Sequence, residues 1–178
     1  MLPFKTLLVE GGKIKILFAL FLFLSLLVGM GLQPRNADEI YKEYQHLRET
    51  ATPQEIFTNN FKIFLLMLIP VFGIIIGCIS FFNAGVVLGV VAVKMQIAPS
   101  LVILNLLISP IFWMEFLVYT LAITRGTLLI LDLFQHFSKG EKGSNFLRKH
   151  FWLMLTLFIF GILLLSFAAV LEFFLLHL

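Results

Sequence analysis

The sequence predicts an all-α, polytopic transmembrane helical bundle of about five spans, with a short extracytoplasmic amphipathic helix. Of the 178 residues, 60% are hydrophobic and only 13% are charged, and the mean hydropathy is +1.02. A soluble domain is typically about 45–50% apolar and about 25% charged, so much of this apolar surface must face lipid. We therefore expect a single membrane domain over residues 1–178, with the lipid bilayer as a partner.

The first apolar run covers residues 14–32, where the only charged residue is Lys15 at its start. At 1.5 Å per residue the run reaches about 28 Å, close to the hydrocarbon thickness of a bilayer. Lys5 and Lys13 precede it. A cleaved signal peptide is the alternative, but the apolar core of such a peptide is usually about 7–15 residues long. The run is therefore predicted to be an uncleaved anchor.

Residues 33–60 form the largest polar segment, which is predicted to be extracytoplasmic. Within it Ile40, Tyr44 and Leu47 stand at i, i+4 and i+7, the spacing of an amphipathic helix. We expect that helix over residues 37–50. Thr52, followed by Pro53 and by Glu55 at the third position, predicts a fresh helix start that continues into the membrane.

The remaining apolar runs predict four more spans, at residues 61–82, 84–96, 100–124 and 151–176. Pro70 should kink the first of these, and the stretch Asn83-Ala84-Gly85 should break the chain before the next. Residues 84–96 are short for a span, so a re-entrant hairpin is the alternative. Pro110 is a candidate break in the fourth run.

The distribution of basic residues favours five full spans. The first basic segment precedes the first span, and the second is the loop at residues 138–150, which contains Lys139, Lys142, Arg148 and Lys149. Five crossings put both segments on one side, as the positive-inside rule expects. The prediction is a multi-pass protein of the cell membrane with a cytoplasmic N-terminus, a cytoplasmic basic loop and an extracytoplasmic C-terminus.

Glu115 is the strongest single candidate for a functional residue, because it lies deep within the predicted span at 100–124. A charge at that depth costs a few kcal/mol, so it should be paired, protonated or turned to the bundle interior. Its helix neighbours at i+4, i+7 and i+11 are Tyr119, Ala122 and Gly126. That face is small and polar, which predicts that it turns to the interior of the protein. Two interpretations stay open: a contact for an ion, proton or substrate, and a structural hydrogen bond to Asn60 or Asn83.

The candidate polar or helix-breaking residues at membrane depth are Asn60, Asn83, Pro110, Glu115 and Arg125. Two Gly-x-x-x-Gly pairs add candidate packing positions, at Gly73 and Gly77 and at Gly85 and Gly89. Such pairs let two helix backbones approach closely. They indicate either homodimerisation or packing within the monomer, of which the second is the commoner use.

No pattern indicates an enzyme, and we predict no catalytic, cofactor-binding or metal-binding residues. Cys78 is the one cysteine, so neither a disulfide nor a cysteine metal site is expected within one chain. Asp132 and His136, at i and i+4, suit either half of a metal or proton site or a solvated helix end. A phosphate-binding loop is absent, so ATP-driven transport would need a separate ATPase subunit. The net charge of +3 and the short basic segments do not suggest a nucleic-acid partner.

The central region resembles the stage II sporulation protein M family of multi-spanning membrane proteins. The residues that carry the resemblance are Asn59-Asn60, Gly73, Gly77, Asn83-Ala84-Gly85, Gly89, the stretch Pro110 to Glu115, and Arg125. The match covers roughly residues 55–130. Ile111 and Phe112 stand where that family typically has His and Gly.

The resemblance implies a five-span protein with its N-terminus inside the cell. In spore-forming bacteria, members of that family scaffold cell-wall remodelling enzymes, and the family has also been likened to permease subunits of ATP-driven exporters. Two functions are therefore predicted. The first is a non-enzymatic scaffold or accessory subunit that binds other membrane or extracytoplasmic proteins through residues 37–50. The second is a homodimeric permease-like subunit with Glu115 in the membrane path.

Overall fold

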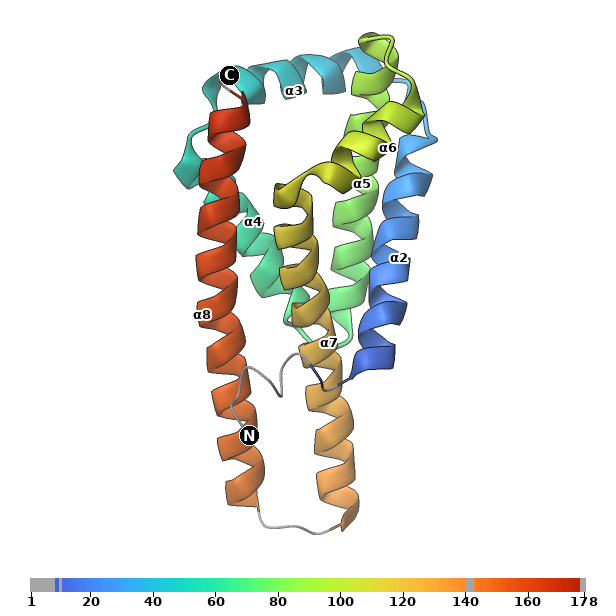
Figure 1. The fold of residues 1–178 in the computed structure, drawn as a ribbon. Helices are drawn as coiled ribbons and strands as arrows, with labels where there is room; N and C mark the ends of the chain where they lie inside the picture. The colour runs from blue at the N-terminus through green and yellow to red at the C-terminus, as the bar shows by residue number, and fades with distance from the viewer. Residues whose placement is uncertain (1–8, 10, 140–142, 177–178) are drawn as a thin grey trace.

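The chain folds into a bundle of helices that pack along one common axis (Figure 1). The computed structural model describes residue 9, residues 11–139 and residues 143–176. Across these residues the helices are α2 (Gly12–Met30), α3 (Ala37–Thr50), α4 (Pro53–Met67), α5 (Phe72–Lys94), α6 (Pro99–Ile108), α7 (Pro110–Lys139) and α8 (Gly143–Leu176). The predicted all-α bundle is confirmed, and α3 lies across one end of it.

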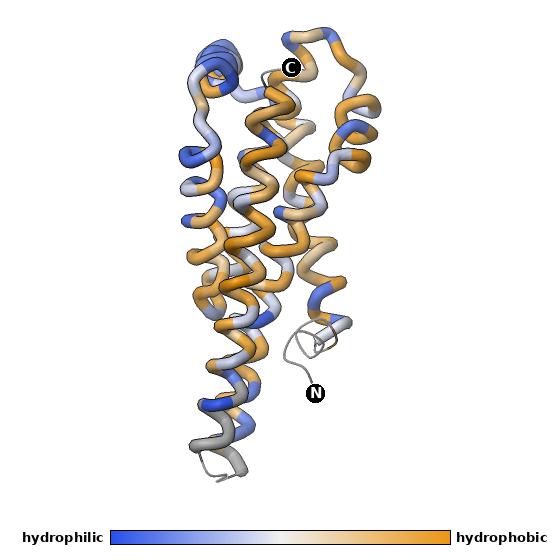
Figure 2. Tube along the Cα trace, turned by 60° about the vertical axis from the view of Figure 1, so that its left-hand side comes forward, coloured by the Kyte–Doolittle hydropathy of each residue, from blue (hydrophilic) through white to orange (hydrophobic). Residues whose placement is uncertain are grey.

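Among the described residues, four helical stretches are long and apolar enough to cross a membrane: Gly12–Met30, Phe72–Lys94, Pro110–Phe137 and His150–Leu176. The first and last coincide closely with predicted spans. Figure 2 shows the apolar residues concentrated along the length of the bundle, with hydrophilic residues gathered towards its ends. α4 and α6 are shorter, at 15 and 10 residues, and lie obliquely to the longer helices (Figure 1).

The predicted boundaries of the second and third spans are wrong. The chain reverses between α4 and α5 at residues 68–71, where Pro70 supplies no backbone N–H and Val71 adopts a φ of 67°. The backbone N–H of Phe72 then donates to the carbonyl of Pro70 at 2.8 Å. α5 continues as one 23-residue helix through the predicted break at residues 83–85. Residues 84–96 are therefore neither a separate span nor a re-entrant hairpin, because most of them form the second half of α5.

The predicted fourth span is broken at Pro110, as expected. Ser109 takes an extended conformation with a ψ of 120° and separates α6 from α7. The indole N–H of Trp113 donates to the carbonyl of Leu107 at 2.7 Å, which satisfies a backbone acceptor at the end of α6. α7 then continues well beyond the predicted end at residue 124 and reaches Lys139. Residues 140–142 of the predicted basic loop lie outside the described residues.

The start of α4 follows the predicted capping pattern. The backbone N–H of Glu55 donates to the hydroxyl of Thr52 at 3.3 Å, and the backbone N–H of Thr52 donates to the Glu55 carboxylate at 2.9 Å. Pro53 occupies the first helical position. These bonds satisfy N–H groups that a helix start otherwise leaves without partners. The cap fixes where the chain leaves α3 and turns into the bundle.

Glycines allow α2 and α5 to pack backbone against backbone. A Cβ placed on Gly85 would overlap the carbonyl of Leu26, and a Cβ on Gly29 would overlap the carbonyl of Phe82. Each helix thus presents a glycine to a backbone carbonyl of the other. A contact this close gains its energy from dispersion and needs no polar side chain.

The other predicted packing glycines are also used within the monomer. The backbone of Met30 stands against Gly89, and the backbone of Met67 stands against Gly73. Gly77 faces side chains of α2 and α7, and all four predicted glycines are buried. Packing within the monomer, the favoured interpretation of these pairs, is therefore confirmed. Homodimerisation stays a prediction that must rest on other surfaces.

Candidate functional site

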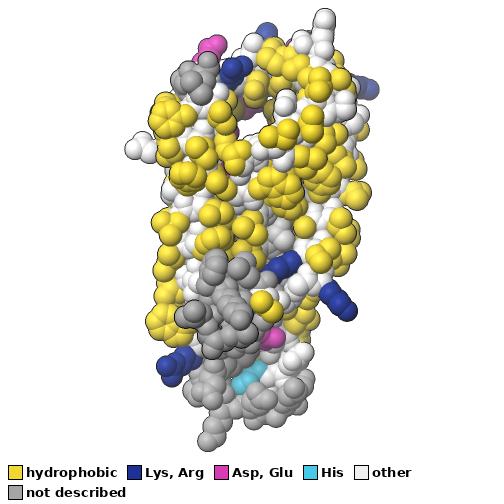
Figure 3. Space-filling view, viewed as in Figure 1, with side chains coloured by type: hydrophobic (Ala, Val, Ile, Leu, Met, Phe, Trp, Pro, Cys, Tyr) yellow, Lys and Arg dark blue, Asp and Glu magenta, His cyan; other side chains and the backbone are white. Residues whose placement is uncertain are grey.

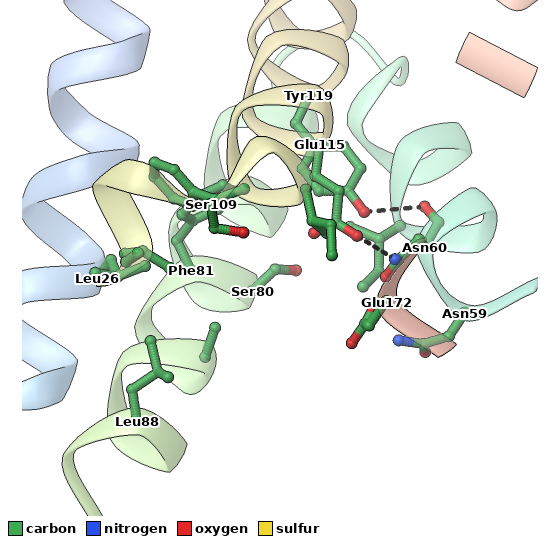
Figure 4. Close-up of a pocket in the computed structure, with 15 residues that line it drawn as sticks. Leu26, Asn59, Asn60, Ser80, Phe81, Leu88, Ser109, Glu115, Tyr119 and Glu172 are labelled. Atoms are coloured by element: carbon green, nitrogen blue, oxygen red, sulfur yellow. Dashed lines mark hydrogen bonds between the residues drawn. The ribbon is translucent and has the colours of Figure 1, made fainter. Parts of the chain in front are cut away.

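A half-open cavity of about 440 Å³ lies between the helices near the α3 end. Six helices contribute to its wall (Figure 4), and the polar lining residues are Asn59, Asn60, Ser80, Ser109, Glu115, Tyr119 and Glu172. The rest of the wall is apolar and includes the rings of Phe81 and Phe112. Cavities of this size with a few converging polar groups are typical of small-molecule sites.

Glu115 is held in the wall by a hydrogen bond from α4. The side-chain amide of Asn60 donates to the Glu115 carboxyl at 2.5 Å, and the hydroxyl of Tyr119 donates to the backbone carbonyl of Asn60 at 3.3 Å. α7 therefore contacts Asn60 through two separate groups. Of the two predicted partners of Glu115, Asn60 is confirmed. Asn83 is wrong, because it is exposed on α5.

The predicted interior face of α7 is also confirmed. Tyr119, one turn after Glu115, keeps only 4% of its surface exposed, and Ala122 is fully buried. Gly126, one further turn on, is buried against the α4–α5 turn. Pro110 begins α7, which places Glu115 in the second turn of that helix. The break before Pro110 thus determines how deep in the bundle the carboxyl lies.

Glu172 brings a second carboxyl to the cavity from α8 (Figure 4). It makes no hydrogen bond or ion pair with the residues that the structure describes. Among the described lining residues there is also no Lys, Arg or His side chain. The cavity therefore has an acidic polar surface without a neutralising base in its wall.

A second cavity, of about 630 Å³, lies directly beneath α3. Its wall includes Asn59, Asn60 and Glu172, which also line the inner cavity. The two spaces therefore adjoin at these three side chains. Figure 3 shows the corresponding face hollowed near the α3 end, between surfaces of apolar side chains.

Arg125 lies apart from this site, near the α4–α5 turn, and its exposed fraction is only 3%. A guanidinium N–H contacts Nδ1 of the buried His150, whose Nε2 lies 3.4 Å from the Asp132 carboxylate. Because a guanidinium only donates, Nδ1 accepts and Nε2 carries the proton that faces Asp132. Asp132 on α7 therefore faces α8 through His150.

Sequence reasoning placed Glu115 and Asn60 correctly and missed three residues of these clusters. Glu172 was visible as an acid within an apolar run, which was the available signal. Tyr119 was placed on the interior face but without a role, and His150 gave no local signal at all. Within the described part of the chain, no group of three or more His, Cys, Asp or Glu side chains could hold a metal ion.

Comparison of the chain with protein-family models, curated proteins and solved structures finds no match. The resemblance to the stage II sporulation protein M family therefore stays a prediction from the residues quoted above. The functional argument rests on the geometry of the cavity.

Proposed function

We propose that this chain is a permease-like membrane protein whose inner cavity binds a small cationic solute. The observation that carries the proposal is the pair of carboxyls, Glu115 and Glu172, on the wall of one cavity inside the bundle. Ionisable groups at membrane depth are costly and by default indicate an ion or substrate path. A scaffold that acts only through its surfaces has no need of two such groups facing an internal space.

The rest of the wall suits a cation. The rings of Phe81, Phe112 and Tyr119 offer π-faces, which attract ammonium groups in desolvated sites. Asn60 orients Glu115 and leaves the remaining carboxyl lone pairs available to a ligand. An organic ammonium ion would thus meet carboxylate oxygens and aromatic carbon together.

Glu115→Gln is expected to weaken cation binding at least about tenfold, the factor that ~1.4 kcal/mol supplies. Glutamine is nearly isosteric, and its carbonyl can still accept from Asn60, so the bundle should remain folded while the acidic group is lost. The measurement is equilibrium binding of radiolabelled tetraethylammonium and tetraphenylphosphonium to the purified protein in mild detergent. Binding needs no ATPase, so a missing partner subunit cannot hide the result.

The matched control is Glu43→Gln, which removes an exposed carboxylate from α3. It should leave the affinity for both cations unchanged. Equal affinities in the wild type and in Glu115→Gln would contradict the proposal, as would wild-type protein that binds neither cation.

The proposed location is the cell membrane, with the N-terminus cytoplasmic and the C-terminus extracytoplasmic. This orientation is supported by the start of α2 and the connected ends of α7 and α8, which lie towards the end of the bundle opposite α3 (Figure 1). The described residues of both predicted basic segments lie there, and the positive-inside rule expects such segments on one side. In intact cells, an impermeant thiol reagent should then label a Glu43→Cys protein.

A scaffold function is the second candidate, favoured by the exposed charged face of α3. Glu39 and Glu43 project from this helix and stay exposed, so they are available to an extracytoplasmic protein. Replacing both with Lys should reduce the partners recovered by crosslinking in native membranes and leave cation binding unchanged. Recovery of the same partners would count against a scaffold role. Recovery of an ATPase subunit or of a second copy of the chain would support the permease-like function.

A further inference from the structure

α3 forms the roof of the outer cavity. The lining residues that it and its C-terminal junction contribute are Tyr44, His46, Leu47, Arg48, Thr50 and Ala51. The floor is formed by α4 and α8, where Asn59, Asn60 and Glu172 lead on to the inner cavity. A solute that enters through the outer cavity therefore passes beneath α3 before it reaches Glu115.

This roof is weakly packed against the bundle. No residue of α3 is buried, whereas α5 buries residues along most of its length. At its C-terminal end, Ala51 and Thr52 are extended, with ψ angles of 130° and 157°. Segments with few buried apolar contacts open locally at low free energy, well below that of global unfolding.

One ion pair ties the N-terminal turn of α3 to the bundle. The Lys94 ammonium, at the end of α5, donates to the Asp38 carboxylate, whose side chain is otherwise 79% exposed. The hydrogen bond and charge of Lys94 hold the pKa of Asp38 below its ordinary value of 3.8, with a smaller effect from Lys42. The carboxylate is therefore ionised, and the pair intact, throughout the neutral pH range.

We propose that α3 is a hinged cover over the entrance to the inner cavity, and that the Asp38–Lys94 pair is its latch. The cover turns about the extended junction at residues 51–52, where the capped start of α4 stays fixed, and the non-helical residues 31–36 that join it to α2 give at its other end. Opening exposes the outer cavity to the aqueous phase. This device depends on the two adjoining cavities and on the Asp38–Lys94 pair, and not on which ligand the cavities bind.

The experiment measures access to the inner cavity with a cysteine probe. Cys78 is first replaced by Ala, and Ser80→Cys then places a thiol on the cavity wall with little change in volume. The probe is a charged, membrane-impermeant maleimide, and the rate of labelling is followed by mass spectrometry. The latch variants are Asp38→Ala, Lys94→Ala and the exchange of the two charges, Asp38→Lys with Lys94→Asp.

Either alanine variant should raise the labelling rate of the Ser80→Cys thiol roughly two- to fivefold, the range available from an exposed ion pair. The charge exchange should return the rate to nearly the wild-type value, because the pair can re-form with opposite polarity. A Glu43→Cys thiol on the outer face of α3 should label at the same rate in all backgrounds. Unchanged fluorescence of Trp113 and Trp152 confirms that each variant is folded.

Equal labelling rates at Ser80→Cys in all latch backgrounds would overturn the cover. So would a charge exchange that labels as fast as the alanine variants, since that result indicates local damage and not a broken latch. Neither outcome bears on cation binding, which is measured separately with an intact latch. Failure of the cover and failure of the proposed function are therefore distinguishable.

Discussion

Gly85→Val is expected to lower the free energy of unfolding by about 3 kcal/mol. Overpacking a core typically costs about 1–3 kcal/mol, and this position belongs at the upper end. A Cβ on Gly85 meets the backbone of Leu26, and α2 cannot move away without losing its other close contact at Gly29. Reversible unfolding in mixed detergent micelles, followed by the fluorescence of Trp113 and Trp152, measures the loss.

Gly12→Val is the matched control for this prediction. It makes the same substitution in the first turn of α2, where a Cβ has no atom within 4 Å. The free energy of unfolding should then change by less than about 0.5 kcal/mol, as is usual for surface substitutions. If both variants unfolded like the wild type, the glycine contact between α2 and α5 would not be the source of stability that we infer.

Arg125→Leu should also cost about 3 kcal/mol, for a different reason. The substitution removes the donor that faces Nδ1 of His150, and a buried acceptor left without its charged donor is expensive. Breaking one partner of a buried charged group commonly costs about 3–5 kcal/mol. The partly exposed Asp132 lets water recover some of this loss. The same unfolding measurement applies.

Two further variants separate the network from a general effect of losing charge. Arg148→Leu removes an exposed arginine from the same region and should change the free energy of unfolding by less than about 0.5 kcal/mol. The double variant Arg125→Leu with His150→Leu should cost clearly less than the sum of the two single variants, because neither side chain remains to be satisfied. Strict additivity would show that the two residues do not act together.

Local signals account for what could be predicted of the fold. The spacing of Ile40, Tyr44 and Leu47 and the cap at Thr52 are properties of neighbouring residues, and both elements form where expected. The predicted break at residues 83–85 was wrong because the continuity of the helix there depends on contacts with residues distant in the sequence. Gly85 weakens an isolated helix, but here it gains a close contact with α2 that only the folded chain provides.

The same distinction applies to the site. Glu115 is visible in the sequence because a charge within an apolar run is exceptional, and its interior helix face follows from a spacing of 3.6 residues per turn. Glu172 faces the same cavity from α8, and no local pattern shows that these two carboxyls share one wall. His150 could not be predicted for the same reason, because its partner Arg125 comes from the preceding helix.

The shortness of α4 has a consequence for the surrounding bilayer. Its 15 residues rise about 22 Å, which is less than the roughly 30 Å of hydrocarbon in a typical membrane. Lipids beside α4 must shorten or tilt to meet it, whereas those beside the 23-residue α5 need not. The bilayer around the protein should therefore differ in thickness from one side to the other, and it should be thinnest beside α4, the helix that carries Asn60. The acyl-chain length of a membrane is then expected to influence in which cellular membrane the protein resides.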